Sequence, residues 1–162
     1  MAVPEIIPIA YEPEHRTDKI GRYTQGQFLA SITYAFPDGH RRGEGWEDAK
    51  RLYCVLHRFD VDGRHVDSDI WCAGTWREQQ QQRGRPDSPL AQAEARMAEL
   101  LRALSQLAYQ NIEIRPFRMT FDNVLFGLVI EQHGGNEDED DWAELYPDRR
   151  GFSAPWNGEY ST

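Results

Sequence analysis

The residues best suited to catalysis lie in one short stretch of the chain, residues 52–72, with the sequence LYCVLHRFDVDGRHVDSDIWC. Apolar and polar residues alternate on either side of Asp60-Val61-Asp62-Gly63, which predicts a β-hairpin closed by a type I turn and a glycine bulge. In that register His57 lies opposite Asp67, close enough for a hydrogen bond between imidazole and carboxylate. Such a pair could orient a general base, so His57 and Asp67 are the candidate catalytic residues if the protein is an enzyme. The alternative is a solvated, charged sheet face, because no nucleophile accompanies the pair.

The turn register also decides which residues are expected in the core. With Asp60 opposite Arg64, the core face would carry Leu52, Cys54, Leu56, Val66, Ile70 and Cys72. The opposite face would carry Tyr53, Val55, His57, Phe59, His65, Asp67, Asp69 and Trp71. A two-residue turn at Asp62-Gly63 is the alternative, and it would shift the pairing by one residue. The first register is preferred because it separates polar from apolar residues more cleanly.

Metal binding and thiol chemistry are not indicated by this hairpin. Four aspartates suggest a calcium loop, namely Asp60, Asp62, Asp67 and Asp69. The fifth position counted from the first of them is Arg64, where such a loop has an oxygen ligand. Cys54 and Cys72 would lie diagonally on neighbouring strands, about 7–8 Å apart between Cα atoms, which is long for a disulfide. We interpret both cysteines as small buried apolar residues, and we expect neither a metal nor a cofactor.

Several residues could instead form a binding surface. Two tryptophans, Trp71 and Trp76, could line a pocket, although ordinary core packing is the alternative. An acidic run near the C-terminus could attract a basic partner, although a solvated loop is again the alternative. The candidate binding residues are therefore Trp71, Trp76, Asp67, Asp69, Glu137, Asp138, Glu139, Asp140 and Asp141.

Charge is distributed unevenly along the 162 residues, whose formal net charge is −9. Residues 1–130 carry 16 basic and 18 acidic side chains, whereas residues 131–162 carry 2 and 9. A net-acidic chain without a basic stripe is a poor binder of nucleic acids or anionic membranes, because both are negatively charged and are bound mainly through Lys and Arg. No apolar run approaches the ~20 residues that span a membrane, and the first ten residues do not resemble a signal peptide. We therefore expect a cytoplasmic protein with reduced cysteines.

Hydrophobic periodicity predicts the elements that position these residues. Residues 20–36 and 117–130 alternate around turns at Thr24-Gln25-Gly26 and Asp122-Asn123, which predicts two further hairpins. Ser88 followed by Pro89 is typical of a helix start, and the apolar spacing predicts one long amphipathic helix over about 88–109. Strands, helix and strands in this order predict an α+β fold, in which one helix packs on a twisted antiparallel sheet built from hairpins.

The chain is long enough for one domain with a sizeable core. Residues 1–130 form the predicted α+β body, and residues 131–162 form an acidic loop followed by a segment with five aromatic residues. Aromatic residues at that density are seldom left in water, so we expect this segment to pack on the same domain. Docking on a partner is the alternative.

Two segments, LYCVLHRFDVDGRHVDSDIWCAGTW and WAELYPDRRGFSAPWNGEYST, resemble those of small actinobacterial proteins known as formate hydrogenlyase regulatory protein HycA. The resemblance implies a regulatory role through protein contacts and supplies no catalytic residues. The sequence therefore predicts a non-catalytic cytoplasmic regulatory protein that binds a protein partner. One alternative is an immunity protein or antitoxin that neutralises a basic partner, since an acidic patch speeds such capture. The other alternative is a small enzyme that uses His57 and Asp67.

Overall fold

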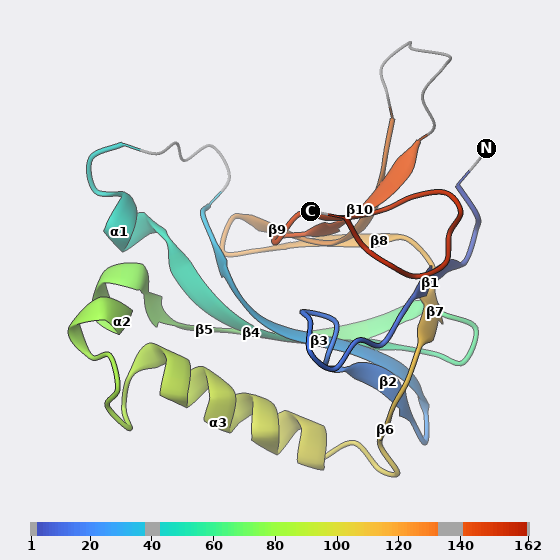
Figure 1. The fold of residues 1–162 in the computed structure, drawn as a ribbon. Helices are drawn as coiled ribbons and strands as arrows, with labels where there is room; N and C mark the ends of the chain where they lie inside the picture. The colour runs from blue at the N-terminus through green and yellow to red at the C-terminus, as the bar shows by residue number, and fades with distance from the viewer. Residues whose placement is uncertain (1–2, 38–42, 133–140, 162) are drawn as a thin grey trace.

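The structure is built from three stacked layers, as Figure 1 shows. The computed structural model describes residues 3–37, 43–132 and 141–161. A five-stranded sheet forms the middle layer, one helix lies against its lower face, and a four-stranded sheet lies above it. Every pairing between the described strands is antiparallel, so the predicted α+β class with antiparallel sheets is confirmed.

The middle sheet has the strand order β5-β4-β3-β2-β6. Its strands are β2 (Ile20–Tyr23), β3 (Gly26–Ala35), β4 (Arg51–Phe59), β5 (His65–Thr75) and β6 (Ala108–Tyr109). The turn between β2 and β3 places Tyr23 opposite Gly26, which confirms the hairpin predicted over residues 20–36.

The upper sheet has the strand order β11-β10-β9-β8. Its strands are β8 (Phe117–Phe121), β9 (Val124–Glu131), β10 (Trp142–Tyr146) and β11 (Arg150–Phe152). Asp122 and Asn123 have φ angles of 51° and 61°, as a two-residue turn of the hairpin type requires, and the predicted β8–β9 hairpin is confirmed. A separate two-stranded sheet pairs β1 (Ile7–Ile9) with β7 (Ile112–Ile114).

The C-terminal aromatic segment contributes to the core of the upper sheet. Strand β10 pairs with β9 along its whole length, and β11 pairs with β10. Ala143, Leu145 and Phe152 are buried in one cluster with the isoleucines of β1 and β7. The segment therefore packs on the body of the same chain.

Three helices are present in the described residues: α1 (Trp46–Ala49), α2 (Trp76–Gln81) and α3 (Pro89–Arg102). Helix α3 begins where predicted, because the Ser88 hydroxyl accepts a hydrogen bond from the Ala91 N–H and Pro89 takes the first helical position. None of these helices combines the length and apolar character that crossing a membrane requires.

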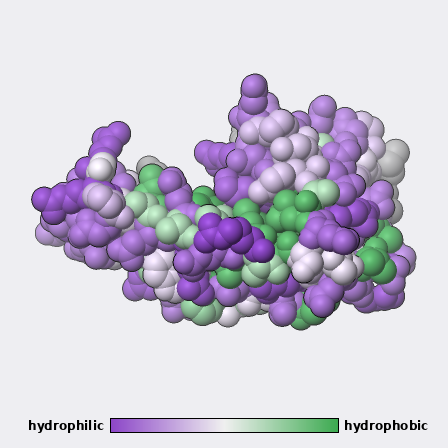
Figure 2. Space-filling view, turned by 90° about the horizontal axis from the view of Figure 1, so that it is seen from below, coloured by the Kyte–Doolittle hydropathy of each residue, from purple (hydrophilic) through white to green (hydrophobic). Residues whose placement is uncertain are grey.

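The expected single long helix over 88–109 is not confirmed, because α3 ends at Arg102. The chain then turns through Gln106, whose φ of 57° is left-handed, and enters strand β6 beside β2. Leu104 and Leu107 still contact the core below the sheet, but they do so from this turn. Figure 2 shows the face that carries α3, where hydrophobic residues form a patch within a hydrophilic surround.

The β4–β5 hairpin has the predicted turn. The Asp60 N–H donates to the Arg64 carbonyl at 2.9 Å, and the Gly63 N–H donates to the Asp60 carbonyl at 3.0 Å. Gly63 has a φ of 85°, the left-handed conformation that a glycine bulge needs. The alternative two-residue turn is therefore not formed.

Beyond the turn, however, the predicted register is wrong by one residue from Arg58 back to Tyr53, and a second shift makes it wrong by two at Leu52. A β-bulge lies between the pairs Phe59–His65 and Arg58–Asp67, and Val66 is the extra residue, 61% exposed. Consequently His57 lies opposite Ser68 and not opposite Asp67. Residue alternation could not predict the bulge, because a bulge changes which residues are paired and leaves no mark in the order of residue types.

The bulge also exchanges the predicted faces of β5. Ile70 and Cys72 pack under the upper sheet with Tyr53 and Val55, and Trp71 packs on the α3 side. Strand β4 is buried on both faces, so its apolar pattern does not distinguish one register from the other. The two cysteines fall in different clusters on opposite faces, and both are free thiols.

Candidate functional site

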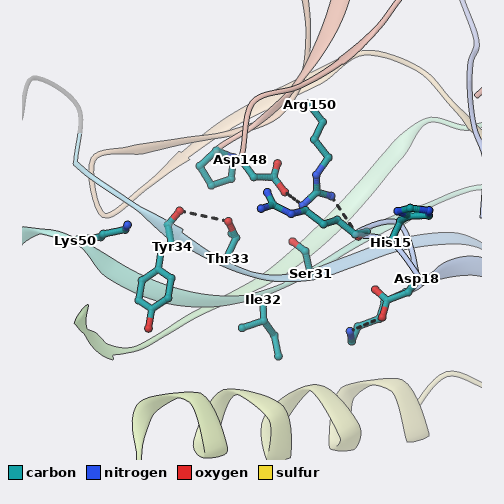
Figure 3. A pocket seen from close by; sticks show the side chains of 12 residues that line it. His15, Asp18, Ser31, Ile32, Thr33, Tyr34, Lys50, Asp148 and Arg150 are labelled. Atoms are coloured by element: carbon teal, nitrogen blue, oxygen red, sulfur yellow. Dashed lines mark hydrogen bonds and ion pairs between the residues drawn. The ribbon is translucent and has the colours of Figure 1, made fainter. Parts of the chain in front are cut away.

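A polar cleft of about 790 Å³ lies between the middle sheet and the turn that joins β10 to β11. Figure 3 shows this cleft from close by. Its lining comes from the segment before β2, from β3, from the residue before β4 and from the β10–β11 turn. The lining residues are His15, Arg16, Asp18, Lys19, Ser31, Ile32, Thr33, Tyr34, Lys50, Pro147, Asp148 and Arg150.

Strand β3 positions a hydroxyl in this cleft. Side chains alternate between the two faces of a strand, and Figure 3 shows Ser31 pointing toward Arg150 whereas Ile32 and Tyr34 point toward α3. The Thr33 hydroxyl donates to the Tyr34 carbonyl at 3.3 Å. The Ser31 hydroxyl makes no hydrogen bond to the described residues, so it is available to a ligand.

An ion pair forms the inner wall of the cleft. The Arg150 Nη2 and Asp148 Oδ2 atoms are 2.5 Å apart, and Arg150 Nη1 donates to the Arg16 carbonyl at 3.2 Å. Burial raises the pKa of Asp148, although the neighbouring Arg150 and Arg16 oppose that shift. Burial likewise lowers the pKa of Arg150. The Arg150 Nε–H is buried and has no acceptor among the described residues.

The cleft carries more positive than negative charge. Two of its four cations are neutralised locally, because Lys19 lies 3.0 Å from Asp18 and Arg150 is paired with Asp148. The other two, Arg16 and Lys50, have no carboxylate within ion-pair distance in the part of the chain that the structure describes. A chain with a formal net charge of −9 thus contains a local cationic site.

The chemistry available in this cleft is oxyanion binding. Guanidinium groups match carboxylate and phosphate oxygens with paired N–H donors, an ammonium supplies a point charge, and a hydroxyl adds a neutral donor. No group of three His, Cys, Asp or Glu side chains within residues 3–37, 43–132 and 141–161 is placed to hold a metal ion.

The predicted catalytic pair is not brought together. Asp67 bonds to Arg58, with Oδ1 and Nη1 2.9 Å apart, on the solvent-facing part of the hairpin. His57 instead contacts Ser68, with its Nδ1 2.6 Å from the hydroxyl oxygen. The predicted pair is wrong because the β-bulge moves Asp67 out of the position opposite His57.

Ser68 lies between the imidazole rings of His57 and His65, an arrangement that residue alternation did not predict. His65 Nε2 is 2.7 Å from the Ser68 hydroxyl oxygen, and both histidine rings contact the ring of Phe117 in β8. The hydroxyl has one proton, so one imidazole accepts it while the other donates its N–H. Burial lowers the pKa of His57 to about 3, so this imidazole is neutral at physiological pH. Ser68 lines neither the cleft nor its neighbouring grooves, and we interpret the cluster as structural.

The predicted binding residues are dispersed over the molecule. Asp69 pairs with Arg96 of α3 at 3.0 Å, and the same guanidinium lies over the Trp71 ring at 5.2 Å from its centroid. Trp76 packs against Trp46, with ring centroids 4.8 Å apart, and joins α2 to α1. Asp141 is half-buried beside β10. Glu137, Asp138, Glu139 and Asp140 lie outside the described residues.

An apolar groove of about 830 Å³ runs beside α3, within the hydrophobic patch of Figure 2. Ile32 of β3, Met97 and Leu101 of α3 and Leu107 of the following turn line it. At its ends Leu90 is 39% exposed and Tyr109 is 45% exposed. The sequence did not predict this groove, because it depends on how α3 and the turn after it pack against β3.

The sequence contains one signal for the cationic cleft. Only two of the 18 basic residues are lysine, Lys19 and Lys50, and both line the cleft. The lysine count does not indicate which residues meet in the cleft, because residues 16, 31, 50 and 150 are brought together only by the stacking of the two sheets. A comparison of the chain with protein-family models, with curated proteins and with solved structures finds no match.

Proposed function

We propose that this protein is a non-catalytic binding protein whose cleft between the sheets takes a small oxyanion ligand. One observation carries the proposal: Arg16 and Lys50 line the cleft without a carboxylate partner among the described residues. Solvent-exposed cations are common, but these two face a concave space that also contains the buried Arg150 and the free Ser31 hydroxyl. Convergence of several donors on one cavity is typical of a ligand site.

The shared chemistry of the ligand is a carboxylate or phosphate group. The Asp148 carboxylate would repel such a group if it were unpaired, but Arg150 neutralises it at 2.5 Å. The net charge offered to the ligand therefore comes from Arg16 and Lys50.

Titration calorimetry at low ionic strength, with inorganic phosphate and citrate as separate probes, tests the proposal and distinguishes the two anion types. Arg16→Gln and Lys50→Gln should each weaken binding of the preferred anion about ten- to hundredfold, since hydrogen bonds to charged groups are worth about 1.5–3 kcal/mol. Arg83→Gln, which alters an exposed arginine that does not line the cleft, is the matched control. The proposal fails if neither anion binds, or if the three variants behave alike.

A regulatory role through contacts with a protein partner is the second candidate function. The apolar groove beside α3 favours it, because partly exposed apolar residues around a concave surface are typical of interaction sites. Leu101→Glu should abolish capture of a partner that the wild-type protein and Arg83→Gln both retain. Equal capture by all three proteins would exclude the groove as the contact surface.

A further inference from the structure

The cleft does not end at Lys50 but adjoins a second groove of about 420 Å³. Tyr34, Lys50 and Pro147 line both spaces, so a single ligand can extend from one into the other. The other residues of this second groove are Ala35, Phe36, Pro37, Val124, Leu125, Tyr146 and Arg149.

The two spaces differ in chemistry. The cleft contains the unpaired Arg16, whereas Arg149 of the second groove is bound to the Glu144 carboxylate and lies over the Tyr146 ring, 4.9 Å from its centroid. Arg149 and the shared Lys50 are the charged residues of the second groove. Its other lining residues are aromatic, aliphatic or proline. It therefore suits an uncharged, flat part of a ligand.

Lys50 lies at the junction of the two spaces. Its ammonium is 5.4 Å from the centroid of the Tyr34 ring and 5.9 Å from that of Phe36. An ammonium in this position can bind an anion while the Phe36 ring packs against the group that carries it. The anion and the flat group would then be adjacent within the ligand.

We infer that the ligand is an aromatic oxyanion, a small molecule in which a planar ring is joined to a phosphate or carboxylate group. The inference rests on the proposed anion site, because the cleft would hold the oxyanion. The second groove would hold the ring, between Phe36 and Leu125 on the apolar side and the Tyr146–Arg149 stack.

Titration calorimetry with inorganic phosphate, phenyl phosphate and cyclohexyl phosphate at one ionic strength tests this inference. Phenyl phosphate should bind the wild-type protein at least about tenfold more tightly than inorganic phosphate, as burial of a six-carbon ring predicts. It should also bind more tightly than cyclohexyl phosphate, which has the same number of carbons but is not flat. Leu125→Ala should remove most of the gain from the ring and leave inorganic phosphate affinity unchanged, because Leu125 lines the second groove but not the cleft.

The possible failures are distinct. If inorganic phosphate binds and Arg16→Gln weakens it, but the phenyl group adds nothing, the aromatic ligand is excluded and the anion site stands. Equal binding of the phenyl and cyclohexyl compounds excludes the requirement for a planar ring. If none of these phosphates binds and citrate does not bind either, the anion site itself is wrong and the inference fails with it.

Discussion

Asp148 and Arg150 form an ion pair that is almost wholly removed from solvent, with side-chain exposures of 8% and 6%. The two residues flank Arg149 at the β10–β11 turn, and Arg150 also bonds to the Arg16 carbonyl. The pair thereby joins the N-terminal segment to the upper sheet and forms the wall of the cationic cleft. A buried charge is tolerated when its partner is present and is costly when the partner is removed.

We therefore expect Asp148→Asn to lower the free energy of unfolding by about 3 kcal/mol, because Arg150 would remain buried without its counterion. Urea unfolding monitored by circular dichroism measures this change. A decrease below about 1 kcal/mol would mean that water reaches the pair and stabilises the lone guanidinium.

Asp67→Asn should have a much smaller effect than Asp148→Asn. Asp67 is 57% exposed in its pair with Arg58, and exposed ion pairs contribute about 0–1 kcal/mol. Urea unfolding should show a change within that range.

The buried His57 should make stability depend on pH. The unfolded chain binds a proton below about pH 6.5, whereas the folded chain does so only near pH 3, because burial lowers the pKa of His57 to about 3. Between these values the unfolded state holds more protons, so this contribution to stability is present above pH 6.5 and is lost as the pH falls. The loss approaches about 1.4 kcal/mol per pH unit.

Urea unfolding at pH 7, 6, 5 and 4 measures this dependence. His57→Gln should reduce the slope of the unfolding free energy against pH by up to about 1.4 kcal/mol per pH unit, which corresponds to one proton. His65 contributes in the same direction, because burial lowers its pKa as well. Arg16, Asp148 and Arg150 line a small cavity together with His57 and are present in both proteins. An unchanged slope in His57→Gln would show that His57 is already protonated in the folded protein at mildly acidic pH.

Gly63→Ala should destabilise the fold by about 2 kcal/mol or more. Gly63 has a φ of +85°, and an added Cβ would lie 2.6 Å from the Glu113 carbonyl oxygen and 2.9 Å from Ile114 Cα, both in β7. Gly84→Ala is the matched control, since Gly84 has a φ of +81° but no atom near the added Cβ. We expect the control to cost about 1 kcal/mol, the strain of the left-handed backbone alone. Equal unfolding midpoints in urea would mean that β7 shifts away from the turn.

Local features of the chain were predictable because neighbouring residues determine them. The N-cap at Ser88, the glycine bulge at Gly63 and the turn at Asp122-Asn123 each depend on the conformational preference of one or two residues. The three hairpins followed from alternation between such turns. The end of α3 was not predictable in this way, because Leu104 and Leu107 contact the core from a turn as well as they would from a helix.

The sequence by itself determined the antiparallel α+β class, the places where the chain turns and the acidic excess of the whole molecule. Only the tertiary structure decided the β-bulge at Val66, which separates His57 from Asp67, and the cleft that unites Arg16, Ser31, Lys50 and Arg150. Turn and helix-start preferences act over a few residues, so they can be recognised in a single chain. A cleft between stacked sheets depends on contacts between residues more than one hundred positions apart, and residue order contains no local trace of them.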